Sequence, residues 1–129
     1  MKKVFLLLCV LVYISCGKDK QKEDFGTSKN NPTEDVSKKS LLNEGKAIFE
    51  GKGTCITCHQ ADKKIIGPSI SEISKIYKEK NASIVSFLKE EGEALVDPSQ
   101  YAIMKTNFAI TKAMSDKELV ALEAYILSY

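Results

Sequence analysis

The stretch Cys55-Ile56-Thr57-Cys58-His59 decides how the rest of this 129-residue chain is interpreted. Two thiols stand three residues apart and an imidazole follows the second directly, which is the C-x-x-C-H pattern of covalent haem attachment. Positions i and i+3 of a helical turn share one face, so Cys55 and Cys58 can each bond one haem vinyl group. His59 is then carried beneath the porphyrin, where it can bind the iron. The sequence therefore predicts one covalent haem.

Other uses of a closely spaced cysteine pair fit the chain less well. A tetrahedral zinc site needs four ligands, and the chain has neither a second such pair nor a second histidine. A thioredoxin-like redox pair needs a βαβ setting, of which the neighbouring sequence gives no sign. A disulfide across three residues would be strained. Haem attachment is therefore the preferred interpretation.

The first fifteen residues have the plan of an export signal. Lys2 and Lys3 precede an apolar run over residues 4–12, and small or polar residues then lead to Cys16. The run is too short for a spanning helix, which needs about 20 apolar residues. Residues 1–15 are therefore predicted to be a signal peptide.

The tetrapeptide Tyr13-Ile14-Ser15-Cys16 resembles a bacterial lipobox, with Tyr13 standing where that motif usually has Leu. The resemblance implies that Cys16 is lipidated, and that the protein is a lipoprotein anchored on the periplasmic side of a bacterial membrane. The alternative is an ordinary secretory signal that leaves Cys16 as a free thiol. Lipidation accounts for every cysteine, because Cys9 leaves with the signal and haem takes the remaining two.

Residues 16–40 are predicted to be the lipidated cysteine followed by a flexible linker. Charged and small polar residues dominate this segment, in which Phe25 and Val36 are the only sizeable apolar side chains. Such a segment cannot bury enough apolar surface to offset the entropy of ordering it. A soft linker of this length spans roughly 25 to 30 Å, which would let a small domain move above the membrane.

Charge excludes one class of partner. The chain has no Arg, and removal of the signal leaves 17 of its 19 Lys against 17 acidic residues. Without a basic stripe, nucleic-acid binding has no electrostatic footprint. Several lysines near the motif or near Met104 are either a steering ring for an acidic partner or ordinary solvated side chains. These are Lys52, Lys63, Lys64, Lys105 and Lys112.

Residues 41–129 are predicted to form one all-α domain, because apolar residues recur at helical spacing at both of its ends. The first set is Leu41, Leu42, Gly45, Ile48 and Phe49, in a helix ending near Gly51, and the last set is Leu119, Leu122, Tyr125 and Ile126. Ser115 and Glu118 fit a capping box at the start of the last helix, with Met114 as its hydrophobic staple. Two shorter helices are expected in between, one over residues 69–80 and one that starts after Asn81 or Ser83 and ends near Lys89.

With the haem motif between two such helices, the domain resembles the class I c-type cytochromes, which are small monohaem proteins. The resemblance implies the small all-α cytochrome c fold, in which the N- and C-terminal helices cross around a covalent haem. Gly45 and Phe49 on the first helix and Leu122 and Tyr125 on the last match that pair of crossed helices. The implied cofactor is one haem c with its iron.

Two further elements of the chain match this family. Gly67-Pro68-Ser69 matches its Gly-Pro element, and by analogy the Pro68 carbonyl accepts a hydrogen bond from the His59 ring. Asp97-Pro98 breaks the chain into a loop, after which Tyr101 and Ile103 form one short turn beside the haem. Side chains predicted for the haem pocket are Phe49, Ile65, Ile66, Phe87, Tyr101 and Phe108.

The sixth iron ligand is predicted to be Met104. The chain has no second histidine, and Met1 leaves with the signal, so Met104 and Met114 remain. Met114 already has a structural role before the last helix, whereas Met104 lies in an apparently irregular stretch over residues 104–108, where a thioether has no packing reason to be. The resemblance agrees, since the family's ligand methionine lies in a loop before the last helix, although no proline follows Met104 here.

The function that these predictions favour is that of an electron carrier working by outer-sphere transfer, and not that of an enzyme. Its partners would be respiratory complexes or a terminal oxidase or reductase. One alternative is a haem enzyme or gas sensor with an open sixth site; the chain has no Arg and no second His to polarise a bound ligand. Another is a redox subunit of a larger oxidoreductase.

Overall fold

A computed structural model describes residues 32–129, which form helices joined by turns and loops. The long helices are α1 (Pro32–Glu50), α2 (Ile70–Lys80) and α6 (Asp116–Ile126). The short ones are η1 (Cys55–Thr57), α3 (Ile84–Leu88), η2 (Pro98–Gln100), α4 (Tyr101–Lys105) and α5 (Phe108–Thr111). Within this range no residue belongs to a β-strand, and one isolated bridge pairs His59 with Lys64. The predicted all-α fold is confirmed.

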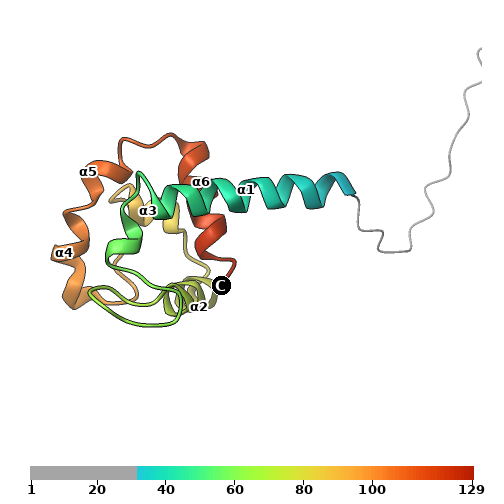
Figure 1. The fold of residues 1–129 in the computed structure, drawn as a ribbon. Coiled ribbons are helices and arrows are strands. Elements are labelled where there is room, and N and C mark those ends of the chain that lie inside the picture. The colour runs from blue at the N-terminus through green and yellow to red at the C-terminus, as the bar shows by residue number, and fades with distance from the viewer. Residues whose placement is uncertain (1–31) are drawn as a thin grey trace, which may run out of the picture.

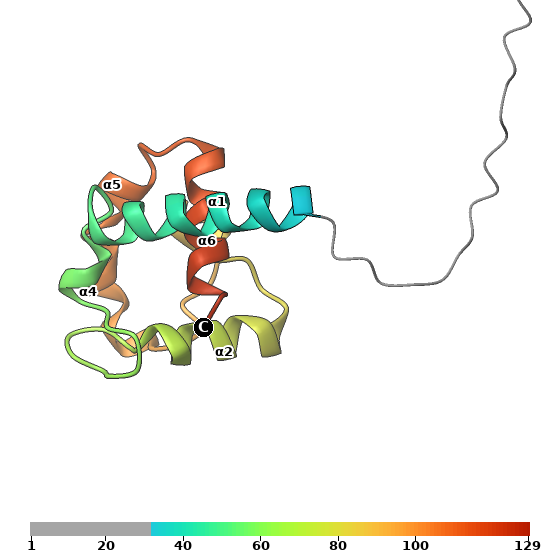
Figure 2. The same cartoon turned by 45° about the vertical axis from the view of Figure 1, so that its right-hand side comes forward.

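α1 and α6 cross each other, as Figures 1 and 2 show from two directions. Gly45 lies at the crossing, because a Cβ built on it would come within 2.0 Å of the Ala121 carbonyl oxygen and 2.7 Å of the Tyr125 Cβ. The Phe49 and Tyr125 rings pack with their centroids 5.5 Å apart. A side chain at position 45 would force the two backbones apart, so the predicted crossing depends on this glycine.

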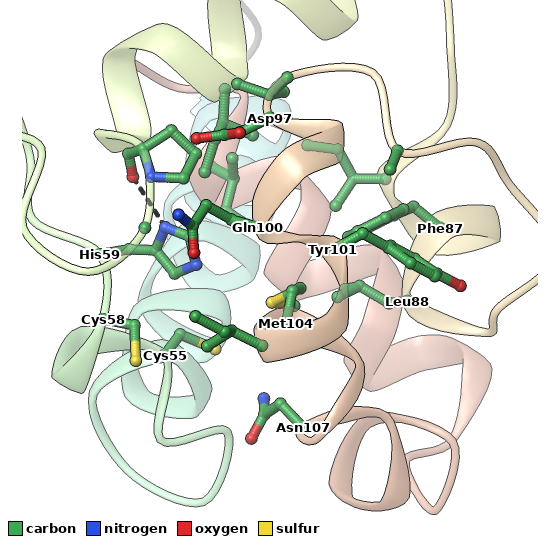
Figure 3. A pocket seen from close by; sticks show the side chains of 18 of the residues that line it. Cys55, Cys58, His59, Phe87, Leu88, Asp97, Gln100, Tyr101, Met104 and Asn107 are labelled. Atoms are coloured by element: carbon green, nitrogen blue, oxygen red, sulfur yellow. Dashed lines mark hydrogen bonds between the residues drawn. The ribbon is translucent and has the colours of Figure 1, made fainter.

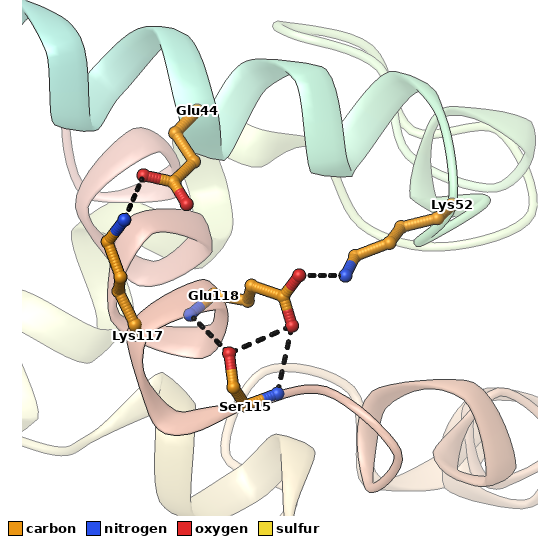
Figure 4. Close-up of polar contacts among 5 residues, drawn as sticks. All are labelled: Glu44, Lys52, Ser115, Lys117 and Glu118. Carbon is orange, nitrogen blue, oxygen red and sulfur yellow. Dashed lines mark hydrogen bonds and ion pairs between the residues drawn. The ribbon is translucent and has the colours of Figure 1, made fainter.

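The start of α6 is fixed by polar contacts that Figure 4 shows. The Ser115 hydroxyl accepts a hydrogen bond from the Glu118 backbone N–H, and the Glu118 carboxylate accepts one from the Ser115 N–H at 2.9 Å, which completes the predicted capping box. The carboxylate also pairs with Lys52, and these hydrogen bonds from Lys52 and Ser115 lower the pKa of Glu118 to about 2. Across the same crossing, Lys117 pairs with Glu44 at 3.5 Å.

The core lies between α6 and the helices around it. Leu119 and Leu122 are fully buried, and Met114 is buried in the same cluster, as expected of a staple. α2 and α3 both contact α6, and each begins at a serine whose side chain accepts a hydrogen bond from the first turn. Ser83 is the cap of α3. Asn81, the other predicted candidate, instead ends α2 with a φ of 48°.

α1 begins nine residues earlier than predicted. The predicted domain boundary at residue 41 therefore falls inside a helix, and residues 32–40 of the predicted flexible linker are helical. Glu34 and Asp35 in the first turn favour a helix amino terminus, and the packed half of α1 supplies the nucleus from which the exposed half propagates. Figure 2 shows the exposed, amino-terminal half of α1 extending beyond the other helices.

The predicted signal peptide, Cys16 and the rest of the predicted linker lie outside the described residues. Among residues 32–129, no helix combines the length and the apolar character needed to cross a membrane.

Candidate haem site

A cavity of about 310 Å³ opens beside the Cys-x-x-Cys-His turn. Cys55, Cys58 and His59 line it from one segment and Met104 lines it from α4, as Figure 3 shows. The remaining lining is mostly apolar and comes from α1, α2, α3 and α6 as well as from the loops. Among these side chains are Phe49, Ile73, Tyr77, Leu88, Leu122 and Ile126. The helices that form the core therefore also form the apolar walls of this cavity, next to the Cys55 and Cys58 sulfurs and the His59 imidazole.

The attachment turn has the compact geometry that the spacing predicts. The Cys58 and His59 backbone N–H groups both donate to the Cys55 carbonyl, at 3.1 and 3.0 Å. The Cys55 and Cys58 side chains are both partly buried. Before haem is attached, burial raises the pKa of the Cys55 thiol to about 11, which favours the protonated thiol at neutral pH. Two thiols on one short turn beside an apolar cavity fit attachment to a flat apolar macrocycle.

The His59 ring is held by the Gly-Pro element. Its Nδ1 lies 2.7 Å from the Pro68 carbonyl oxygen. Because a carbonyl only accepts, Nδ1 carries the proton and Nε2 keeps its lone pair for a metal. Gly67 leaves room for the ring, since a Cβ there would lie 2.4 Å from the His59 Cε1. The predicted hydrogen bond from His59 to Pro68 is confirmed.

Met104 lies in a short helix, which differs from the irregular stretch that was predicted for it. Pro98 opens the turn η2, which continues directly into α4, so the turn expected at Tyr101 and Ile103 extends to Lys105. Proline is favoured at the first helical position because it has no N–H to leave unpaired. α4 presents Met104 to the cavity, whereas Met114 is buried in the core and does not line it.

The predicted pocket members divide into two groups. Phe49, Ile66, Phe87 and Tyr101 line the cavity, and the predictions for Ile65 and Phe108 are wrong. Ile65 is exposed on the loop whose next residue, Ile66, takes the place at the cavity.

Phe108 lies behind the cavity wall. It is buried, and its ring centroid is 5.3 Å from that of Phe87 and 5.9 Å from that of Tyr101. Phe108 therefore supports two aromatic rings that do line the cavity.

Most of the lysines considered for partner steering are paired with acidic side chains. Lys52 pairs with Glu118, Lys64 with Asp97 at 2.8 Å, and both Lys105 and Lys112 with Glu90 at 2.5 and 3.0 Å. Exposed pairs of this kind contribute little stability, but they neutralise the lysine charge. The four paired lysines therefore do not form the open ring of positive charge that would steer an acidic partner.

Sequence reasoning missed two polar residues that hold the cavity together. The Asn107 side chain donates to the Gly53 carbonyl at 3.1 Å and accepts from the Thr54 hydroxyl at 3.1 Å. Glu123 on α6 accepts from the Ile84 backbone N–H at 2.6 Å and so caps α3 from another helix. Neither has a local sequence signal, because the partners are about 40 to 50 residues away in the chain.

An all-α fold in which two thiols, one oriented imidazole and an apolar cavity meet defines a protein that binds haem covalently. A family model for cytochrome c matches residues 42–129. The chain therefore belongs to the cytochrome c family, as a class I c-type cytochrome, and its cofactor is one covalently bound haem c with its iron. Membership of this family makes the chain a haem-binding electron carrier. No curated protein matches the sequence significantly.

Proposed function

We propose that the protein transfers single electrons by an outer-sphere mechanism, with His59 and Met104 as the two axial ligands of the haem iron. The observation that carries this proposal is that His59 and Met104 line the same apolar cavity while Met114 lies elsewhere in the core. A thioether and an imidazole that both remain bound leave no coordination site for a substrate, which is what an electron carrier requires.

Each residue of the site has a definite task in this mechanism. When bound, the haem iron supplies the one-electron couple. Cys55 and Cys58 hold the macrocycle through two thioether bonds, and the Pro68 carbonyl keeps the His59 ring in one tautomer and one orientation. The apolar lining excludes water and disfavours the additional positive charge that the iron would carry in its oxidised state. Together with a thioether ligand, this lining favours the reduced state and hence a comparatively high reduction potential.

The competing function is a haem enzyme or a gas sensor with an open sixth site. Enzymes of this kind need a donor on the distal side to polarise the bound ligand, and the chain contains no Arg and only one His. A third function, that of a redox subunit docked in a larger oxidoreductase, uses the same site and differs only in the lifetime of the complex.

We further propose that Cys16 carries a lipid that anchors the protein on the periplasmic side of a bacterial membrane, where it meets respiratory complexes or a terminal oxidase or reductase. The support is the sequence of residues 1–16, with its basic start, short apolar run and lipobox-like end. Mass spectrometry of the mature amino terminus tests this proposal: a diacylated Cys16 is expected, and an unmodified thiol would contradict it.

The ligand assignment is tested by absorption spectra of the haem-loaded protein, oxidised and reduced. The weak far-red band of an iron–thioether bond is expected in the unmutated protein and is expected to disappear in Met104→Ala. Met114→Ala serves as the matched control, since it should keep the band while lowering the free energy of unfolding by about 2 to 4 kcal/mol through a core cavity. A high-spin spectrum of the unmutated protein, with new bands on adding carbon monoxide, would favour the open-site enzyme or sensor.

A further inference from the structure

Asn107 connects two segments that lie far apart in the sequence. It follows α4, and its side-chain amide uses both of its ends: Nδ2 donates to the Gly53 carbonyl and Oδ1 accepts from the Thr54 hydroxyl, each at 3.1 Å. Gly53 and Thr54 are the two residues directly before Cys55. The amide therefore spans from the segment that carries Met104 to the turn that carries the haem thiols, and Figure 3 shows Asn107 on the side of the cavity next to Met104.

The Asn107 side chain bonds to these distant residues and does not cap the helix that follows it, α5. Asn107 stands at the N-cap position of α5, where an asparagine side chain ordinarily accepts a hydrogen bond from the first turn, but it makes no such bond here. The Asn107 backbone N–H donates a hydrogen bond to the Met104 carbonyl at 3.0 Å. The Gly53 carbonyl that receives the amide also lies 3.4 Å from the Cys55 thiol. One residue thus joins the backbone of Met104 to the backbone beside Cys55.

The other side-chain hydrogen bonds and ion pairs of residues 98–107 do not reach the attachment turn in the described part of the chain. Thr106 donates to the Ile103 carbonyl, which lies within the same turn. Lys105 pairs with Glu90, and both side chains have substantial solvent exposure, so water and salt screen this pair. Among the described residues, Asn107 is therefore the one whose side chain hydrogen-bonds the Met104 segment to the turn before Cys55.

We propose that Asn107 is a positioning residue that holds Met104 in the cavity. Building on the proposed function, in which Met104 is the sixth ligand, the Asn107 amide keeps the α4 turn closed against the attachment turn and so limits how often the thioether leaves the iron. With both amide hydrogen bonds removed, the α4 turn opens more often. A small external ligand then gains access to the sixth position without any change at Met104 itself.

The test is the rate at which carbon monoxide binds to the reduced haem-loaded protein, measured by stopped flow together with the far-red thioether band. Asn107→Ala, which removes both bonds, is expected to bind carbon monoxide about tenfold faster, the ratio that follows from losing one to two ordinary hydrogen bonds. Thr54→Ala removes one bond and is expected to accelerate binding about threefold. Thr54→Ser keeps the hydroxyl and is expected to match the unmutated protein.

A second control separates positioning from a general loss of stability. Lys105→Ala breaks the other side-chain tie of the same segment, and it is expected to leave the carbon monoxide rate unchanged. Guanidinium unfolding of every variant shows whether the global free energy has changed. A merely structural role of Asn107 would lower that free energy without altering the carbon monoxide rate of the native protein.

The outcomes distinguish this inference from the function on which it rests. If the unmutated protein shows the far-red band, and Asn107→Ala keeps both the band and the slow carbon monoxide rate, the role of Asn107 is overturned and the electron-carrier function stands. If the unmutated protein has no band and binds carbon monoxide at once, the methionine ligation fails and the role of Asn107 fails with it.

Discussion

The crossing of α1 with α6 and the Met104 segment, residues 98–107, are built on different principles. At the crossing, Gly45 allows two helix backbones to touch and buried side chains such as Leu122 fill the space around them. The Met104 segment has no fully buried side chain. Its Tyr101 ring packs against Phe87 and Phe108, and its Asn107 amide hydrogen-bonds the Gly53 carbonyl. Burial of whole side chains therefore fixes the helix crossing, while the Met104 segment relies on partly buried side chains together with hydrogen bonds.

This difference predicts two kinds of response to substitution. A change at the crossing removes contacts on which every helix depends, so it should lower the free energy of global unfolding. A change in the Met104 segment should mainly shift a local opening, because the side chains of that segment are exposed or only partly buried. The following predictions test that division, beginning with the largest expected effect.

Gly45→Ala is expected to lower the free energy of unfolding by about 3 kcal/mol, since the added methyl group overlaps the Ala121 carbonyl and the helix backbones must separate. Guanidinium unfolding followed by far-ultraviolet circular dichroism measures this change. Asn43→Ala, on the exposed face of the same helix, is the control and should change stability by about 0.5 kcal/mol or less. Equal stability of the two variants would show that the crossing is not as tight as described.

A smaller effect is expected from acid at the same crossing. Hydrogen bonds from Lys52 and Ser115 lower the pKa of Glu118 from its ordinary 4.5 to about 2. A depressed carboxyl pKa stabilises the fold above the ordinary value, and this contribution is lost as the pH falls toward the folded value. The Tm difference between the unmutated protein and Glu118→Gln should therefore be full above about pH 5 and should vanish near about pH 2.

Salt sharpens the interpretation of the Glu118 experiment. The carboxylate is exposed to solvent, so its interaction with Lys52 is screened, and 1 M salt should reduce the pH-dependent difference. The hydrogen bonds of the capping box are less sensitive to salt, so a part of the difference should remain. A Tm difference that does not vary between about pH 2 and pH 5 would contradict the assigned pKa.

The smallest effect is expected at Glu90, beside the Met104 segment. Its φ of 64° lies in the left-handed region, where glycine is favoured, but its carboxylate pairs with Lys105 and Lys112. Glu90→Gly relieves the backbone strain and loses two exposed ion pairs, so the Tm should change by about 3 °C or less. Glu90→Ala loses the pairs and keeps the strain, and should be the less stable variant. A large drop for Glu90→Gly would mean that the ion pairs stabilise the global fold.

The features that could be predicted from the sequence are those that depend on short, regular patterns of residues. The apolar spacing around Gly45 and Leu122 predicted the two terminal helices, and Ser115 with Glu118 predicted the capping box. The resemblance to class I cytochromes predicted that the helices cross and that Pro68 is the partner of His59. Each pattern acts over a few residues or has a fixed place beside a known motif. The haem attachment turn belongs to this group.

The features that escaped prediction depend on residues distant in the chain. Asn107 bonds to Gly53 and Thr54, and Phe108 packs behind Phe87 and Tyr101, but no spacing rule connects those positions. Composition also misled in one place, because the polar sequence before residue 41 indicated a flexible linker while attachment to a packed helix extends helical structure to Pro32. Long-range contacts, and not local propensity, decide such regions.

The exposed half of α1 has a consequence for motion on the timescale of hydrogen exchange. Residues 34–40 are exposed, so their amide protons depend for protection mainly on the hydrogen bonds of the helix, which propagates from the packed half of α1. Hydrogen-exchange protection should then rise residue by residue from Asp35 toward Leu41. Exchange measured at rising temperature should therefore place the first protected residue of α1 progressively closer to Leu41.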